Sequence, residues 1–208
     1  MAQIDTPCIN EVHITFFNQL IFDVPRFCQF LSRTEHFRSP NRATVTLDRL
    51  SVKVGLSPPM GVFDDAGLLL RILCTEQDWQ LSSMAHLYNS FASHVATLEQ
   101  LCIREGLEDS DSRPQFQAQV DMDDIQWLEF FQPFTAVKDL YLSEEISLPV
   151  VRALRELSGE RITEVLPTLQ NIFLRDQPSE PIQEPMALFI AARELCGCPV
   201  AVHCWEKE

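Results

Sequence analysis

Four side chains of the kinds that bind zinc gather near the C-terminus, in the run Cys196-Gly197-Cys198 followed by His203 and Cys204. Thiolate sulfur and imidazole nitrogen are ligands that zinc prefers in proteins. Structural zinc sites, however, use ligand pairs separated by about two to four residues, and the spacing in this run differs. We therefore predict that these thiols pack at a helix end and on a strand. We expect neither a metal nor another cofactor.

No arrangement of residues predicts a catalytic centre. A Ser or Cys nucleophile needs a His base and an orienting carboxylate, and the sequence has no Gly-x-Ser-x-Gly elbow. His86 and His94 lack the acidic partner of a His-Glu-x-x-His site, and no glycine-rich phosphate loop is present. The pairs Asp123-Asp124 and Glu144-Glu145 stand at expected helix starts, where negative charge is favourable. We predict that the chain is not an enzyme; an unrecognised hydrolase that uses scattered residues is the alternative.

Composition excludes several classes of partner. Among 208 residues, 16 basic and 30 acidic side chains give a formal charge of −14, which repels phosphate backbones and anionic membranes. We predict no nucleic-acid and no membrane partner. No window approaches the roughly 18 apolar residues of a membrane helix, and the N-terminus lacks signal-peptide features. We therefore expect a cytoplasmic or nuclear protein with one domain, residues 1–208, whose seven cysteines are mostly buried and reduced.

One apolar spacing recurs and indicates how the chain is built. Large aliphatic residues occupy positions one, four and six of copies that begin at Ile9, Leu98, Val137 and Leu169. This spacing is typical of the strand of a leucine-rich repeat, in which alternate side chains face opposite sides. The last three copies begin 39 and 32 residues apart, whereas regular repeats span about 20 to 29 residues. The repeats are therefore irregular.

Other segments predict the elements around these copies. The alternating run from Val45 to Leu56 predicts a β-hairpin, and the apolar run 68–74 predicts a strand buried on both faces. Helices are expected after Asp23, at about 79–94, between 121 and 133, before Gly159 and before Gly197. The acidic segment at about 105–120 predicts a mobile loop. The predicted fold class is α/β: a short, irregular leucine-rich-repeat-like arc with a curved, mostly parallel sheet and helices on its convex side.

The strand alternation predicts which side chains point away from the stack. Acidic, basic, amide and aromatic residues are mixed among them, and aromatic residues and Arg often anchor protein interfaces. Outward positions of any sheet have a similar mixture, and helices or a loop that covered them would make them structural. We predict a protein-binding surface made of His13, Arg71, Gln100, Arg104, Asp139, Tyr141, Ser143, Asn171, Phe173, Arg175, His203 and Trp205.

Several stretches resemble the C-terminal part of a large set of basidiomycete fungal proteins described as F-box domain-containing or leucine-rich-repeat-like. They are 7–17 (PCINEVHITFF), 78–83 (DWQLSS), 126–129 (QWLE), 133–144 (PFTAVKDLYLSE), 159–167 (GERITEVLP) and 199–203 (PVAVH). The resemblance implies a ubiquitin-ligase substrate receptor, in which an N-terminal F-box docks a Skp-type adaptor and C-terminal repeats hold the substrate.

The three-helix F-box has no counterpart before residue 40. We therefore expect a Skp-type adaptor as a partner only if an F-box is supplied elsewhere. The expected partner of this chain is a protein whose identity the sequence does not reveal. The alternative is a stand-alone or truncated repeat scaffold without a ligase role.

Overall fold

The computed structural model describes residues 12–17, 40–48, 51–57, 67–73, 95–106, 123–157, 159–175 and 180–205, with single positions at 26, 29, 33, 85, 88, 89 and 91. Its strands are β1 (Val12–Phe17), β2 (Arg42–Asp48), β3 (Ser51–Ser57), β4 (Leu68–Leu73), β5 (Gln100–Glu105), β6 (Asp139–Leu142), β7 (Asn171–Leu174) and β8 (Ala201–Cys204). Its helices are α4 (Asp124–Phe131), α5 (Glu144–Arg155) and α6 (Glu180–Leu195), and a short 3-10 helix, η2, spans Gly159–Thr163. The prediction of an α/β fold is confirmed.

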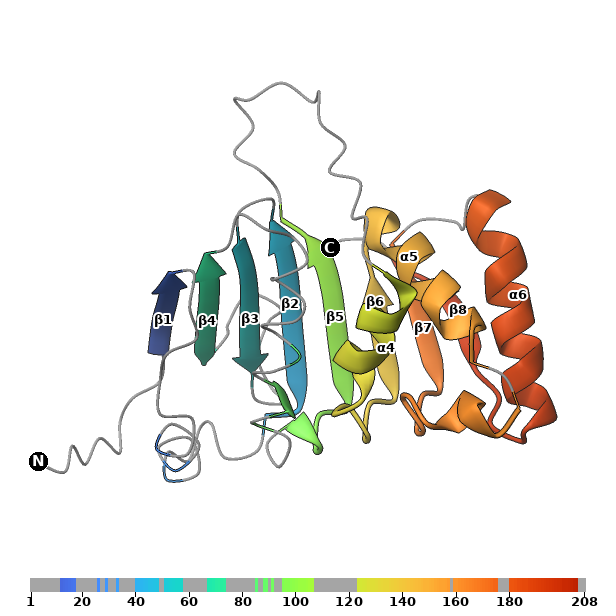
Figure 1. Cartoon of the computed structure of the whole chain (residues 1–208), viewed down its shortest axis with the longest axis horizontal. Helices are drawn as coiled ribbons and strands as arrows, with labels where there is room; N and C mark the ends of the chain where they lie inside the picture. The colour runs from blue at the N-terminus through green and yellow to red at the C-terminus, as the bar shows by residue number, and fades with distance from the viewer. Residues whose placement is uncertain are drawn as a thin grey trace, which may run out of the picture.

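All eight strands belong to one sheet, in the order β1-β4-β3-β2-β5-β6-β7-β8 (Figure 1). Neighbouring strands are parallel except where β3 meets β2 and β4, so β3 alone runs against the rest. The mostly parallel sheet and the hairpin are therefore confirmed. The hairpin lies in the middle of the sheet, between β4 and β5, which the sequence did not predict.

The copies that begin at Leu98, Val137 and Leu169 form adjacent strands in matching register. Leu101, Leu140 and Ile172 stand opposite one another, and each is fully buried. Burial of one aliphatic side chain contributes about 1.5–3 kcal/mol, so this spacing alone favours one register strongly. The end of the copy at Ile9, from Val12 onward, lies in β1, which pairs with β4 at the far edge of the sheet; residues 9–11 lie outside the described residues.

A repeated backbone contact joins these strands before each of them begins. The Glu99 carbonyl accepts hydrogen bonds from the amides of Lys138 (2.8 Å) and Asp139 (3.0 Å). The Lys138 carbonyl does the same for Gln170 (2.8 Å) and Asn171 (2.9 Å). These strands therefore repeat both their apolar spacing and their backbone hydrogen bonds.

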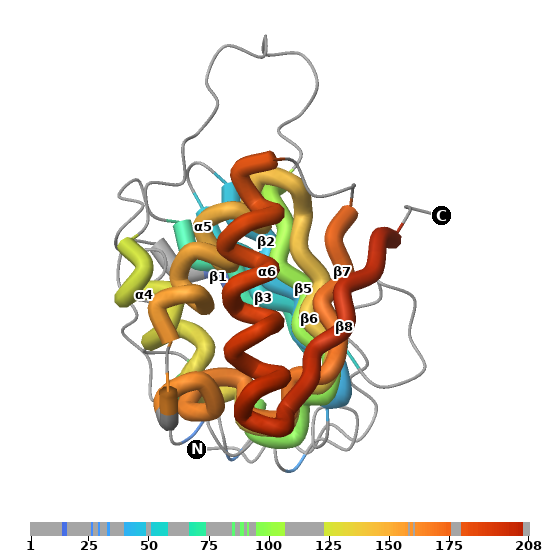
Figure 2. The backbone as a smooth tube through the Cα atoms, turned by 90° about the vertical axis from the view of Figure 1, so that its right-hand side faces the viewer, coloured from blue at the N-terminus to red at the C-terminus, as the bar shows by residue number. Residues whose placement is uncertain are grey.

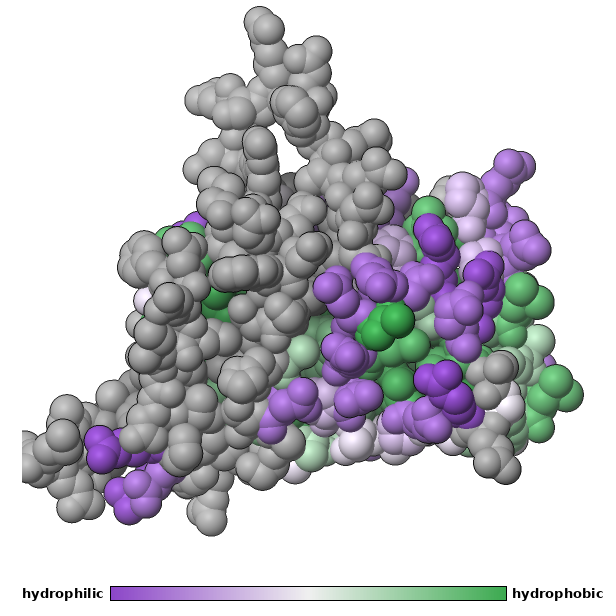
Figure 3. Space-filling model, in the orientation of Figure 1, coloured by the Kyte–Doolittle hydropathy of each residue, from purple (hydrophilic) through white to green (hydrophobic). Residues whose placement is uncertain are grey.

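All three described α-helices lie on the same side of the sheet. Figure 1 shows α4 and α5 in front of β5–β7, and Figure 2, turned by 90°, shows the strands on one side and the helices on the other. Ile146, Val150 and Leu154 recur along one stripe of α5 and are completely buried. Figure 3 shows the helix side, where hydrophilic side chains cover most of the described surface around small apolar patches.

Local residues set the helix ends as predicted. Asp123 caps α4, and its carboxylate accepts a hydrogen bond from the Ile125 amide at 3.2 Å. Glu144 and Glu145 occupy the first turn of α5, where the positive end of the helix dipole stabilises their negative charges. Gly159 follows α5 with φ of 58°, in the left-handed region that favours glycine. The two acidic pairs are therefore helix starts.

One charged side chain lies inside the helix layer. Arg193 of α6 is 1 % exposed, and its guanidinium reaches four backbone carbonyls. Its Nη atoms donate to Ile162 (3.1 Å), Leu169 (3.0 Å) and Pro167 (3.4 Å), and its Nε donates to Cys198 (3.2 Å). Three of these carbonyls belong to η2 and to the segment between η2 and β7, so Arg193 links α6 to that part of the chain.

Strand β4 is buried differently from the prediction, and several predicted segments lie outside the described residues. The strand predicted at 68–74 is β4, but it is buried on one face only: Leu68, Leu70 and Ile72 are buried whereas Arg71 is exposed. The expected helix after Asp23, most of that at 79–94, and the predicted acidic loop from residue 107 onward lie outside the described residues. None of the helices that the structure describes is both long and apolar enough to cross a membrane.

Candidate functional site

The candidate site is the side of β5–β8 that faces away from the helices, which we call the outer face. Strand alternation points Leu101, Leu140 and Ile172 toward the helices. The residues directly before and after each of them on the same strand point outward. Because the strands are parallel and in register, outward residues from equivalent positions form rows across the sheet. None of the described helices lies on this side (Figure 2).

The first row is a ladder of polar side chains. Arg42 Nε donates to Gln100 Oε1 at 2.8 Å, and Gln100 Nε2 donates to Asp139 Oδ2 at 3.3 Å. Asn171 Nδ2 donates to the other oxygen, Oδ1, of Asp139 at 2.8 Å. The Asp139 carboxylate therefore accepts one hydrogen bond from each side, and the ladder holds four strands' side chains in fixed positions.

The second row is aromatic. The rings of Tyr141 and Phe173 are stacked with centroids 4.4 Å apart and an interplanar angle of 8°. The His203 ring stacks on Phe173 at 5.0 Å, and Trp205 meets Tyr141 edge-on at 5.9 Å. His203 Nε2 also lies 3.2 Å from Asn171 Oδ1, which connects this aromatic cluster to the polar ladder. Tyr141, Phe173 and Trp205 are half-buried and His203 is exposed, so the cluster presents part of its surface to solvent.

The surroundings change the acidity of two groups in this row. Burial, followed by the charge of Asp139, raises the pKa of the Tyr141 phenol, so Tyr141 stays neutral and keeps its hydroxyl proton. Burial raises the pKa of the Cys102 thiol to about 11, although Arg104 and Arg42 oppose the shift. The neutral Cys102 thiol is a poor nucleophile at neutral pH. This row is therefore suited to contact and not to covalent chemistry.

The third row consists of Arg104, Ser143 and Arg175. Arg104 and Arg175 are part-exposed and exposed respectively, as predicted, but Ser143 between them is buried. Ser143 is the N-cap of α5: its carbonyl accepts a hydrogen bond from the Ser147 amide at 3.0 Å, and its Oγ accepts one from the Glu105 amide at 3.3 Å. The strand turns into a helix at this residue, which removes Ser143 from the exposed surface.

Two predicted residues are far from the aromatic cluster. The inserted hairpin places β3 and β2 between β4 and β5, so the row runs Arg71, Lys53, Thr46 and Arg104. Arg71 is exposed and lies three strand spacings, or roughly 14 Å, from Arg104. The backbone of His13 pairs with Leu69 on β4, and the side chain of His13 lies outside the described residues.

The hairpin also brings in residues that the prediction missed. Arg42 ends the polar ladder, and Arg104 Nε donates to Thr46 Oγ1 at 3.2 Å. On the next strand, Lys53 Nζ pairs with Asp48 Oδ2 at 2.9 Å. Polar residues at every second position of β2 would have indicated these residues. Their partner strand could not be inferred, because Arg42 and Gln100 are 58 residues apart.

The thiols near the C-terminus do not meet. Cys196 and Cys204 are exposed and Cys198 is partly exposed, whereas Cys102 is buried. The other three cysteines lie outside the described residues, so the prediction that most of the seven are buried stays a prediction. The Sγ atoms of Cys196 and Cys198 lie 3.8 Å from the carbonyls of Gly159 and Cys196, respectively. Within the described ranges, no three His, Cys, Asp or Glu side chains lie close enough together to hold a metal ion.

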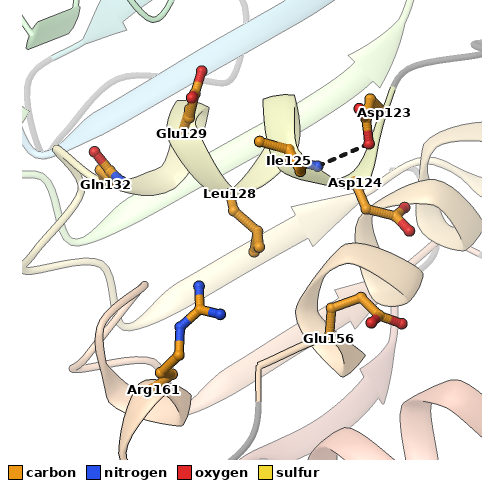
Figure 4. Close-up of a pocket in the computed structure, with 8 residues that line it drawn as sticks. All are labelled: Asp123, Asp124, Ile125, Leu128, Glu129, Gln132, Glu156 and Arg161. Carbon is orange, nitrogen blue, oxygen red and sulfur yellow. Dashed lines mark hydrogen bonds between the residues drawn. The ribbon is translucent and has the colours of Figure 1, made fainter.

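A separate groove of about 590 Å³ lies on the helix side, between α4, the end of α5 and η2 (Figure 4). Leu128 and Arg161 point toward each other across it. Arg161 Nε is bonded to Glu164 Oε2 at 3.1 Å, and Asp123 is occupied as a helix cap. The eight described lining residues contain no Ser, Cys or His, so they offer no nucleophile with a histidine base.

Comparisons of the chain with protein-family models, with curated proteins and with solved structures found no match.

Proposed function

We propose that the chain is a cytoplasmic or nuclear protein-recognition module that binds a partner protein on the outer face. The observation that carries the proposal is the aromatic cluster of Tyr141, Phe173, His203 and Trp205, which stays partly exposed. Aromatic residues with fixed geometry are frequent anchors of protein interfaces. Because the ring contacts and the polar ladder already hold these side chains, little side-chain entropy would be lost on binding.

The proposed architecture is a short, irregular leucine-rich-repeat-like arc with its helices on the convex side. The matching register of β5, β6 and β7 supports it, as do the equivalent carbonyl contacts of Glu99 and Lys138. Repeat proteins of this kind bind partners on an extended strand face, because stacking aligns equivalent outward positions. The resemblance to F-box proteins agrees with this architecture and implies that the bound protein is a ligase substrate.

The recognition role is tested by capture of partners from fungal cytosol. The triple variant Tyr141→Ala, Phe173→Ala, Arg175→Ala is expected to lose the proteins that the unaltered chain captures, with only a modest drop in melting temperature. The control triple on the helix side, Ile125→Ala, Leu188→Ala, Arg152→Ala, replaces two exposed apolar residues and an exposed Arg, and is expected to capture the same proteins as the unaltered chain. Equal capture by the first variant and the unaltered chain would refute a binding role for the outer face.

The ligase role is tested separately with a purified Skp-type adaptor. We expect the chain alone not to bind the adaptor, and a fusion to an F-box to bind it. Substrate degradation in cells by the fusion, lost in the outer-face triple variant, would support the receptor role. Partner binding without any such degradation would support the alternative, a repeat scaffold without a ligase role.

A further inference from the structure

The sign of charge on the outward side of the sheet is opposite to that of the chain. The whole sequence has 30 acidic and 16 basic residues. Outward positions of β2–β7, including the residue directly after β7, contain only two carboxylates, Asp48 and Asp139. The basic residues at these positions are Arg42, Lys53, Arg71, Arg104 and Arg175. Basic side chains are therefore concentrated on the side that carries the proposed binding surface.

The two carboxylates on this side already have partners. Asp48 Oδ2 lies 2.9 Å from Lys53 Nζ and accepts a hydrogen bond from Ser51 Oγ at 2.8 Å. Asp139 accepts hydrogen bonds from the amides of its two neighbours in the polar ladder. Arg175, in contrast, is exposed and makes no ion pair within the described part of the chain. Its guanidinium is available to a carboxylate from another molecule.

The geometry places this charge beside the aromatic cluster. The amides of Ser143 and Arg175 donate to the carbonyls of Ile103 (3.1 Å) and Leu142 (3.2 Å), which continues the register one residue beyond β6 and β7. Arg104 and Arg175 thus lie two strand spacings apart, roughly 10 Å between their Cα atoms. The residue between them, Ser143, is short and buried, so β6 contributes no long side chain between the two guanidinium groups.

We propose that the partner presents an acidic, extended peptide segment to the outer face, an inference that rests on the recognition role proposed above. Carboxylates of the segment bind Arg175 and Arg104, and an apolar side chain lies against Tyr141 and Phe173. Arg binds carboxylates with paired, directional hydrogen bonds. A short peptide interacts with charges within a Debye length of about 8 Å, whereas a long polyanion would also meet the acidic remainder of the molecule.

A display library of random peptides tests this chemistry against the full-length chain. Peptides of about 12 residues are long enough to reach from Arg104 to Arg175 and across the aromatic cluster, because an extended chain rises about 3.3 Å per residue. We expect the enriched sequences to contain more Asp and Glu than Lys and Arg, together with an apolar or aromatic residue. The Arg175→Glu chain is expected to bind an enriched peptide about tenfold more weakly, as measured by fluorescence anisotropy.

The matched control is Arg152→Glu, which changes the net charge equally but lies exposed on α5, on the helix side. Its affinity for the peptide should stay within about twofold of that of the unaltered chain, because salt screens the effect of reversing a distant, exposed charge. Enrichment of neutral or basic peptides, no enrichment, or equal weakening by both substitutions would overturn the inference. So would self-association of the chain that Arg175→Glu abolishes. If capture of native partners still depended on Tyr141 and Phe173, the proposed recognition role would remain supported.

Discussion

Leu140 and Tyr141 are neighbours on β6, and they belong to two different regions of the molecule. Leu140 points toward the helices, is completely buried and aligns with Leu101 and Ile172. Tyr141 points the other way, stacks on Phe173 and remains half-exposed. The same strands thus use one set of alternate residues for packing and leave the other set for contact with another molecule.

Each side has an exception that clarifies the rule. On the helix side, Arg193 is a buried charge that is tolerated because its guanidinium donates to four carbonyls. On the outer face, Cys102 is only 2 % exposed, because a small side chain lies lower than its longer neighbours. Side-chain length and hydrogen bonding, in addition to direction, therefore decide which residues of a row reach solvent.

The largest difference between the sides should appear on substitution of adjacent residues. Leu140→Ala is expected to lower the free energy of unfolding by about 4 kcal/mol, since it removes a buried side chain and leaves a cavity. Tyr141→Ala should cost only about 1 kcal/mol, mainly the stacking with Phe173. Urea denaturation followed by circular dichroism measures both values. Equal losses would mean that Tyr141 belongs to the core.

Removal of the buried charge should have the next largest effect. Arg193→Met is expected to cost about 3 kcal/mol, because backbone carbonyls of Ile162, Pro167 and Leu169 lose a buried donor. Arg193→Lys, which keeps a charge but offers a smaller donor group, should be intermediate. Thermal unfolding monitored by calorimetry gives the order of the three proteins. A fully stable methionine variant would show that the turn before β7 does not need these bonds.

Cys102 should make stability depend on alkaline pH. Its pKa rises from 9.0 to about 11 in the folded chain, so between these values the unfolded chain binds fewer protons. The stabilisation is present below pH 9 and is lost as the pH rises through 11, by about 3 kcal/mol in total. Comparison of urea midpoints with those of Cys102→Ala isolates the effect.

The burial of Cys102 should also slow its alkylation. At pH 8, mass spectrometry after alkylation should show Cys196 and Cys204 modified well before Cys102; similar rates would contradict the burial of Cys102.

The smallest of these effects concerns the polar ladder. Asn171→Ala removes the hydrogen bond to Asp139 and the contact with His203, and should cost about 1 kcal/mol. Gln170→Ala, an exposed neighbour, should cost less than about 0.5 kcal/mol. Chemical denaturation of both variants provides the comparison. If Asn171→Ala is as harmless as its control, the ladder positions side chains without stabilising the fold.

The sequence predicted much of the helix side and less of the outer face. Apolar positions such as Val137, Leu140 and Leu142 are determined by a local period, and all three are buried. The helix starts at Asp123 and Glu144 also depend on neighbouring residues only. Outer-face contacts depend on which strands are adjacent, and the ladder bond between Arg42 and Gln100 joins residues far apart in the chain.

The sequence by itself determined the alternation of each strand, the three copies in register and the mixture of Arg and aromatic residues at outward positions. Tertiary structure decided the order of strands, because insertion of the β2–β3 hairpin between β4 and β5 is a matter of long-range pairing. It thereby moved Arg71 away from the aromatic cluster and brought Arg42 to the ladder. It also buried Ser143, since a residue that begins a helix cannot also extend the strand face.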